Sequence, residues 1–334
     1  MTINNTRQNN AVSELFAHTL VWDNHAGIYP NINTDLAGLS HWKDAGVHYT
    51  SLNVGYDVEG WETTIEVLSA YRAWLANHTD DYIIVTNTRD VERARRESKL
   101  AVSFDIEGMN ALNGRLDMVG LYYDLGVRQM LFAYNLNNDV GGGCHDQDIG
   151  LTDFGRDVVR EMNRVGMLID CSHSSKKTTM EAMALSNSPV VFSHSNVKAI
   201  RDHDRNIDDE QIKACAATGG VIGINGLGIF LGENDCSSQV IADHISYVAE
   251  LVGPKHVGIS LDYAPQADDL GNFLTSRDDY WPPGQAYDTP NIRVAEPRQY
   301  YELCEILMKR GLSSSEIQDI LGANFMRVAE QVWK

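Results

Sequence analysis

The chain has 334 residues, a length that allows two domains but that a single α/β barrel also fills. It carries 46 acidic and 27 basic side chains, and its net charge of −19 repels phosphate backbones and anionic lipid, so we expect no nucleic-acid or membrane partner. The first twenty residues lack the features of a signal peptide and no apolar run is long enough to span a membrane, which predicts a cytoplasmic protein.

Short apolar, β-branched runs alternate with amphipathic stretches along most of the chain. This order of strand and helix is typical of a parallel sheet. The predicted strands are residues 20–27, 47–54, 100–108, 128–135, 167–173, 190–195, 219–225 and 256–263. Because eight strands close a barrel, we predict one α/β domain over residues 1–334, a (β/α)8 TIM barrel.

The amphipathic stretches predict helices at 60–78, 154–166, 176–185 and 208–219. The tail, about residues 296–334, is helical by periodicity, and we expect it to pack against the outside of the barrel. Two long irregular stretches, 136–151 and 264–295, follow the predicted fourth and eighth strands, where barrel enzymes place the loops that contact substrate.

Polar side chains end five of the predicted strands, and these ends converge on one face of a barrel. They are His25, Glu107, His173, His194 and Asp262. His173 and His194 end neighbouring strands with the same Ser-His pair, and because strands lie roughly 4.8 Å apart, both imidazoles can reach one metal ion.

A single histidine in an apolar run is more often a hydrogen-bonded core residue than a ligand, but five such strand ends favour a metal site. Burial of Glu107 among apolar residues would be costly without a cation. Imidazole and carboxylate without thiolate suit zinc best, with iron, manganese and cobalt as alternatives. Cys171 is expected to pack in the core, and the five scattered cysteines to be reduced.

Four segments carry a resemblance to a known family: "VSFDIEG", "GLTDFGRDVVREMNRVGMLIDCSH", "VVFSHSN" and "HDRNIDDEQI". They resemble the membrane (renal) dipeptidase family, metallodipeptidases among the amidohydrolase-like barrels. The resemblance extends from the first to the eighth strand. It implies a (β/α)8 barrel that uses two zinc ions to cleave dipeptides.

The resemblance also implies roles for the polar strand ends. Glu107 would bridge the two zinc ions, with His173 and His194 on one ion and His25 on the other. Asp262 would handle the proton of the attacking water and face the amine of the substrate.

The chain departs from the family pattern at two strands. Gly27 stands where the strand-one motif His-x-Asp places its aspartate, and Asp23 and Asp105 are expected to point into a deeper layer. We therefore predict one strong zinc site and a second site that is weak or empty. The fourth strand has Tyr134 followed by Asn135 in place of a substrate-binding histidine, and these two become the expected substrate-binding residues.

Arg205, in "HDRNIDD", matches the arginine that holds the terminal carboxylate of the substrate in the family. Its guanidinium offers a bidentate fork to a carboxylate. The alternative, at even weight, is a surface ion pair with Asp204, Asp208 or Asp209. His145 is interpreted as a loop residue rather than a ligand.

These features favour a metal-dependent hydrolase that cleaves the amide bond of dipeptides or small N-acyl amino acids. Gly27 and Tyr134 leave two alternatives open. One is a single-metal amidohydrolase acting on a lactone, a cyclic amide or another small molecule, and the other is a barrel that binds a metabolite without turnover. The expected partner is a small-molecule or dipeptide substrate, and the family leaves a homodimer open.

Overall fold

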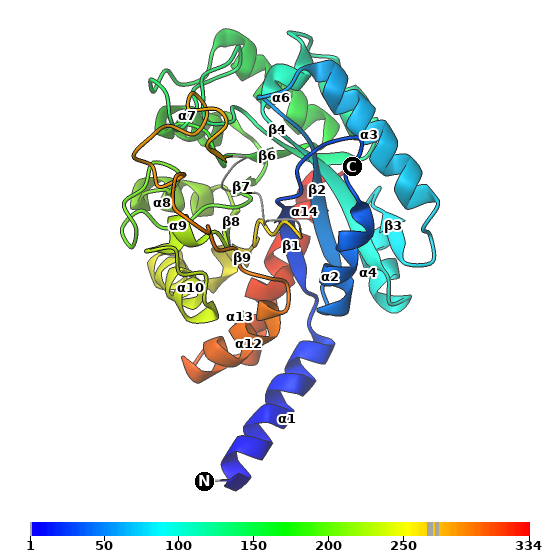
Figure 1. Ribbon diagram of the computed structural model, residues 1–334, viewed down its shortest axis with the longest axis vertical. Coiled ribbons are helices and arrows are strands. Elements are labelled where there is room, and N and C mark those ends of the chain that lie inside the picture. Colours follow the sequence, from blue (N-terminus) through cyan, green and yellow to red (C-terminus); the bar gives the residue numbers. More distant parts are fainter. Residues whose placement is uncertain (1, 266–269, 271–273) are drawn as a thin grey trace.

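A parallel sheet curved into a barrel forms the centre of the computed structural model, which describes residues 2–265, 270 and 274–334 (Figure 1). The strands follow the order β1-β2-β4-β5-β6-β7-β8-β9 around the barrel, and β3 pairs with β4. They are β1 (Trp22–Ala26), β2 (Tyr49–Tyr56), β3 (Tyr82–Ile84), β4 (Leu100–Glu107), β5 (Val127–Leu131), β6 (Leu168–Asp170), β7 (Val190–Phe192), β8 (Val221–Ile224) and β9 (Val257–Ile259). The predicted (β/α)8 barrel is confirmed, and β3, which pairs with β4, is an additional strand that was not predicted.

Several strands end earlier than predicted. The predicted strand 128–135 stops at Leu131, so that Tyr134 and Asn135 belong to the following loop. Asn135, His173 and Asp262 have φ angles of 63°, 60° and 54°. A left-handed backbone cannot continue a strand, so the chain turns out of the sheet at or before these residues. Tyr134, Asn135, His173, His194 and Asp262 therefore stand just beyond the strands, whereas His25 and Glu107 lie within the last two residues of β1 and β4.

At the barrel seam, hydrogen bonds from side chains and loops join β1 to the segment after β9. Oδ1 of Asp23 accepts a hydrogen bond from the main-chain nitrogen of Leu261 at 3.0 Å, and its Oδ2 accepts from Nε1 of Trp42 at 2.8 Å. The nitrogen of Gly27 donates to the main-chain oxygen of Tyr263 at 3.0 Å. Asp23 is therefore a seam residue, with both carboxylate oxygens in use.

Helices surround the sheet, and the four predicted ones are present as α3, α6, α7 and α8 (Figure 1). The helices are α1 (Thr2–His18), α2 (Ser40–Asp44), α3 (Trp61–Ala76), α4 (Thr88–Arg96), α5 (Met118–Asp124), α6 (Asp153–Val165), α7 (Lys176–Leu185), α8 (Asp209–Ala217), α9 (Gly228–Leu231), α10 (Ser238–Val252), α12 (Gln299–Lys309), α13 (Ser314–Gln318) and α14 (Asn324–Val332), with 3-10 turns η1 (Leu36–Leu39), η2 (Met109–Leu112) and η3 (Pro254–His256) and the π-helix η5 (Asp319–Ala323). In the part of the chain that the structure describes, no helix is long and apolar enough to cross a bilayer. Helix α1 extends away from the barrel at the N-terminus (Figure 1).

The C-terminal tail is helical as predicted, but its predicted position is only partly right. Helix α12 lies on the outside against α1 and α10, whereas η5 and α14 contact the strands β1, β8 and β9 themselves. The apolar face of α14 joins Trp22 and Tyr49, at the starts of β1 and β2, in one buried cluster. The tail thus closes the N-terminal end of the barrel, because the side chains that start the strands leave an apolar surface there.

Phe325 of α14 fills this end of the barrel. Its ring lies 6.4 Å from that of Trp22, and a β-carbon at Gly258 in β9 would come closer than 3.0 Å to the ring. Gly223 in β8 would contact the same ring. Glycines on two neighbouring strands therefore make room for one aromatic side chain. A smaller residue at position 325 would leave part of this space empty.

We expect Phe325→Ala to lower the free energy of unfolding by about 3–5 kcal/mol, since it removes a buried ring and leaves a cavity. Denaturant unfolding followed by circular dichroism measures this change. Leu121→Ala, at a side chain of α5 that is 43% exposed, is the matched control and should stay within about 0.5 kcal/mol of the parent. A loss below about 1 kcal/mol for Phe325→Ala would contradict the role given to α14.

Candidate metal centre

Three imidazoles surround one carboxylate oxygen at the C-terminal ends of the strands. Oε1 of Glu107 lies 3.2 Å from Nε2 of His194, 3.4 Å from Nε2 of His173 and 3.7 Å from Nε2 of His25. This oxygen is buried and has no hydrogen-bond partner among the described residues, whereas Oε2 accepts from Nδ2 of Asn53 at 2.8 Å. The structure thus brings together the four residues that the sequence predicts as metal ligands.

The ring of His173 is oriented by Asn135. Nδ1 of His173 lies 2.7 Å from Oδ1 of Asn135, and Nδ2 of Asn135 donates to the main-chain oxygen of Tyr280 at 2.9 Å. That second bond identifies Oδ1 as the acceptor, so Nδ1 of His173 carries the proton and Nε2 presents a lone pair. The side chain of Asn135, which the sequence predicts to bind substrate, is fully buried, and both ends of its amide are occupied by these contacts.

The other two imidazoles have acceptors at Nδ1 as well. Nδ1 of His194 lies 2.6 Å from Oγ of Ser193, whose hydroxyl donates to Oδ2 of Asp170 at 2.5 Å. Nδ1 of His25 lies 3.2 Å from Oδ1 of Asp105. Second partners of this kind are typical of metal-binding histidines, since they fix the tautomer that presents Nε2.

The Nε2 atoms of His173 and His194 face each other, and a positive charge between them would stabilise this arrangement. Nε2 of His173 and Nε2 of His194 are 3.0 Å apart, so two lone pairs point at each other. Burial lowers the pKa of both imidazoles well below the ordinary value, which disfavours a proton in that position. Burial also raises the pKa of Glu107 to about 8, a cost that a bound cation would remove. The donor set therefore fits a divalent metal ion, and His25, Glu107 and His194 offer ligand atoms within 4.8 Å of one another.

Asp262 completes the group from the segment after β9. Its Oδ1 lies 3.5 Å from Nε2 of His25, and its Oδ2 accepts a hydrogen bond from Nδ2 of Asn225 at 2.9 Å. Burial raises the pKa of Asp262 above its ordinary value, although His25 opposes the shift. Burial lowers the pKa of His25, but three carboxylates around this imidazole outweigh that effect and raise it well above the ordinary value: Asp105, Glu107 and Asp262.

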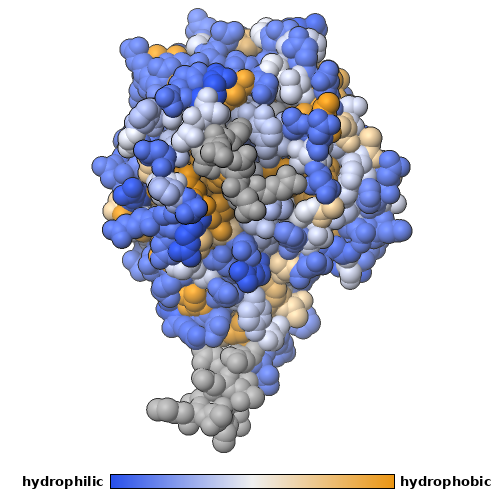
Figure 2. Space-filling view, viewed as in Figure 1, coloured by the Kyte–Doolittle hydropathy of each residue, from blue (hydrophilic) through white to orange (hydrophobic). Residues whose placement is uncertain are grey.

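A cavity of about 450 Å³ opens over these groups. Its wall is largely aromatic and aliphatic, with Tyr56, Tyr134, Phe230, Trp281 and Tyr287 among the lining residues. The ring of Tyr134 stacks on His173 with centroids 4.2 Å apart, which places a phenol beside the metal ligands. Residues 266–269 and 271–273 of the predicted loop 264–295 lie outside the described residues. Figure 2 shows a mostly hydrophilic surface on which apolar side chains gather in a hollow.

Arg205 lies behind the metal ligands and is only 3% exposed. Its Nη2 donates to the main-chain oxygen of His194 at 3.0 Å and its Nη1 to Oγ of Ser195 at 3.4 Å, while Nε has no partner among the described residues. The alternative of a surface ion pair is wrong: Asp204 pairs with Lys198, and the other two aspartates pair likewise with lysines. The arginine is instead held in the interior by the chain after β7.

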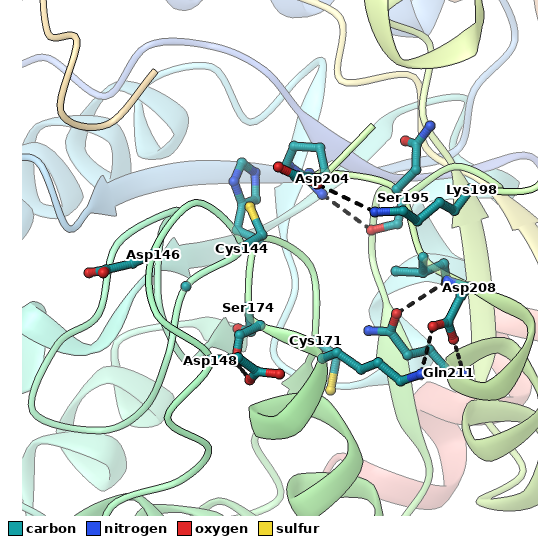
Figure 3. A pocket seen from close by; sticks show the side chains of 17 residues that line it. Cys144, Asp146, Asp148, Cys171, Ser174, Ser195, Lys198, Asp204, Asp208 and Gln211 are labelled. Atoms are coloured by element: carbon teal, nitrogen blue, oxygen red, sulfur yellow. Dashed lines mark hydrogen bonds and ion pairs between the residues drawn. The ribbon is translucent and has the colours of Figure 1, made fainter. Parts of the chain in front are cut away.

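Arg205 borders a second, polar cavity of about 210 Å³ that shares His173 with the first. Figure 3 shows Ser195 and Lys198 on one side of this cavity and Cys144 on the other, with a dashed line joining Lys198 to Asp204. His145 lies nearby with Nε2 2.7 Å from the hydroxyl of Tyr287. This contact agrees with its interpretation as a loop residue. The five cysteines are all free, and Cys171 is buried in the core as predicted.

Sequence reasoning missed the residues that orient the ligands. Asn53, Asp170 and Ser193 are buried polar side chains within or just after apolar strands. A buried aspartate in "LIDCSH" was a usable signal, since a carboxylate there needs donors. Asp105 also falls into this class, as its contact with His25 makes it a partner of a ligand.

Comparison with known proteins links the chain to one family. The family model described as membrane dipeptidase (peptidase family M19) matches residues 56–275. An uncharacterised dipeptidase of Schizosaccharomyces pombe is 28% identical over 285 residues, which cover 81% of this chain and 62% of the relative. A second uncharacterised dipeptidase of that organism is 32% identical over 235 residues, 69% of this chain and 51% of the relative. The chain thus spans about half to three-fifths of the length of these relatives.

A solved structure described as an amidohydrolase from Pseudomonas aeruginosa has the same fold. It superposes with a TM-score of 0.88 at 28% sequence identity and covers 96% of this chain and 99% of its own. The barrel and its C-terminal helices are therefore shared over almost the whole length of both chains.

Proposed function

Because the chain belongs to the membrane dipeptidase family, peptidase family M19, we propose that it is a metal-dependent hydrolase that cleaves the amide bond of dipeptides or small N-acyl amino acids. The observation that carries this proposal is Oε1 of Glu107, a buried oxygen without a hydrogen-bond partner among the described residues that three imidazole nitrogens face. The relatives named as dipeptidases support the choice of bond.

His173, His194 and Glu107 would hold the principal metal ion, and zinc is the metal that best suits two imidazoles and a carboxylate. When bound, zinc polarises a carbonyl oxygen and lowers the pKa of water from 15.7 to about 7. The hydrogen bonds from Nδ1 of both histidines keep their lone pairs directed at the site before any ion arrives.

Asp262 is the group best placed to move a proton. Asn225 holds one of its oxygens, which leaves the other directed towards His25 and the cavity. This carboxylate can accept the proton of the attacking water and deliver it to the leaving nitrogen.

Tyr134 and Arg205 would position the substrate. Tyr134 lines the cavity, and burial raises its pKa well above the ordinary value, so the phenol keeps its proton and can donate to a developing oxyanion. Arg205, beside the carbonyl of His194, would bind the terminal carboxylate of the substrate through its fork of donors.

Metal removal and restoration tests the proposal. Protein stripped with a chelator should lose at least about 99% of its turnover of a dipeptide panel and regain it with zinc, since no other described group supplies the same polarisation. The panel should include N-acyl amino acids, lactones and cyclic amides at matched concentrations. Turnover confined to lactones or cyclic amides would favour the single-metal alternative, and turnover that survives chelation would contradict a metal-dependent reaction.

A further inference from the structure

The segment around Asp262 excludes any side chain at position 27. A β-carbon on Gly27 would lie 2.5 Å from the main-chain oxygen of Asp262 and closer still to its Oδ1. The hydrogen bond from the nitrogen of Gly27 to the oxygen of Tyr263 holds the two segments at this separation. Glycine is thus required here by close approach, and the space beside it contains the carboxylate of Asp262.

The position of that carboxylate is fixed from two sides. Asp262 has a left-handed backbone with φ 54°, which turns its side chain away from the path of β9, and Asn225 binds its Oδ2. Oδ1 is left 3.5 Å from Nε2 of His25, the nitrogen that also lies 3.7 Å from Oε1 of Glu107. One imidazole nitrogen therefore faces two carboxylate oxygens from different strand ends.

We propose that Asp262 supplies the carboxylate that position 27 lacks, so that His25, Glu107 and Asp262 hold a second divalent cation beside the one at His173 and His194. This assignment rests on the proposed function, since it requires Glu107 to bind metal. It replaces the expectation of a weak or empty second site that Gly27 suggested. The carboxylate would then bind the cation through Oδ1, while Oδ2 stays with Asn225.

The assignment can be tested without measuring turnover. The full-length protein is stripped of metal with a chelator, titrated with zinc and desalted, and elemental analysis then counts the ions that each chain retains. The parent chain should retain two ions, and Asp262→Asn should retain one, with affinity for the second reduced at least about tenfold. Asp35→Asn is the matched control, because Asp35 lines the same cavity, carries the same charge and bonds the nitrogen of Ala37 rather than His25. It should retain both ions.

Asn225→Ala provides a second arm that keeps the carboxylate. Freed from Asn225, Asp262 loses its fixed orientation, so the second ion should bind about 10- to 100-fold more weakly while the first is unchanged. This arm decides the question if Asp262→Asn does not fold, as judged by circular dichroism. One ion in the parent chain, or two ions of unchanged affinity in both variants, would overturn the assignment.

The ion counts separate this inference from the proposed function. Two ions that depend on Asp262, without turnover of any amide, would retain the second site and contradict the dipeptidase activity. Dipeptide turnover by a parent chain that holds one ion would support the dipeptidase activity and contradict the second metal site.

Discussion

Glu107→Gln is expected to reduce kcat/KM for dipeptides on the order of 1000-fold, because the change removes the charge that the three imidazoles share. Breaking a buried charge pair typically costs about 3–5 kcal/mol, and each 1.36 kcal/mol is a factor of ten in rate. Glutamine has nearly the same shape and keeps an oxygen for Asn53, so the loss should come from the charge rather than from packing. Steady-state kinetics on the zinc-loaded protein measure it.

A thermal readout separates metal loss from other causes of inactivity. Zinc that binds only the native state should raise the Tm of the parent chain, whereas the Tm of Glu107→Gln should hardly respond. Glu316→Gln is the control, since Glu316 is a partly exposed capping residue of α13, and glutamine also serves in a capping box. If Glu107→Gln retained the parent's zinc response and activity, Glu107 would not be a metal ligand.

The barrel could be predicted because its strands are short apolar runs in regular alternation with amphipathic stretches. The polar residues that end these runs, such as His173, His194 and Asp262, were recognisable for the same reason: they interrupt an apolar pattern. Local pattern also located the helices, since their periodicity and caps lie within a few turns of chain. Helix α8, for example, begins with the capping box formed by Asp208 and Gln211.

What escaped prediction depends on contacts between distant segments. The side chain of Asn135 turns towards His173 because its backbone is left-handed, and no local pattern shows which way such a turn directs a side chain. The position of α14 depends on the ring of Phe325 packing against glycines of β8 and β9. This fit between distant segments leaves no pattern in the local sequence. Gly27 was read as a missing ligand, whereas the structure relates it to Asp262, 235 positions along the chain.

Arg205→Ala is expected to raise KM for dipeptides with a free carboxylate about 10- to 150-fold. A hydrogen bond to a charged group contributes roughly 1.5–3 kcal/mol, and this energy corresponds to that change in affinity. The corresponding dipeptide amides lack the charge that the guanidinium recognises, so their KM should change little. Arg205→Lys keeps the charge but loses the fork, and should recover part of the effect. Lys198→Ala, which removes another cation from the second cavity, is the matched control and should leave KM unchanged.

The amide series decides between two roles for this arginine. Arg205 also donates to the main-chain oxygen of His194, so its removal can disturb a metal ligand as well as substrate binding. A disturbed ligand would lower zinc content and would affect acids and amides alike. A lost carboxylate contact would leave zinc content intact and act on the acids alone. Equal losses for both substrate series would therefore identify Arg205 as a positioning residue for His194 and contradict its role in recognising the carboxylate.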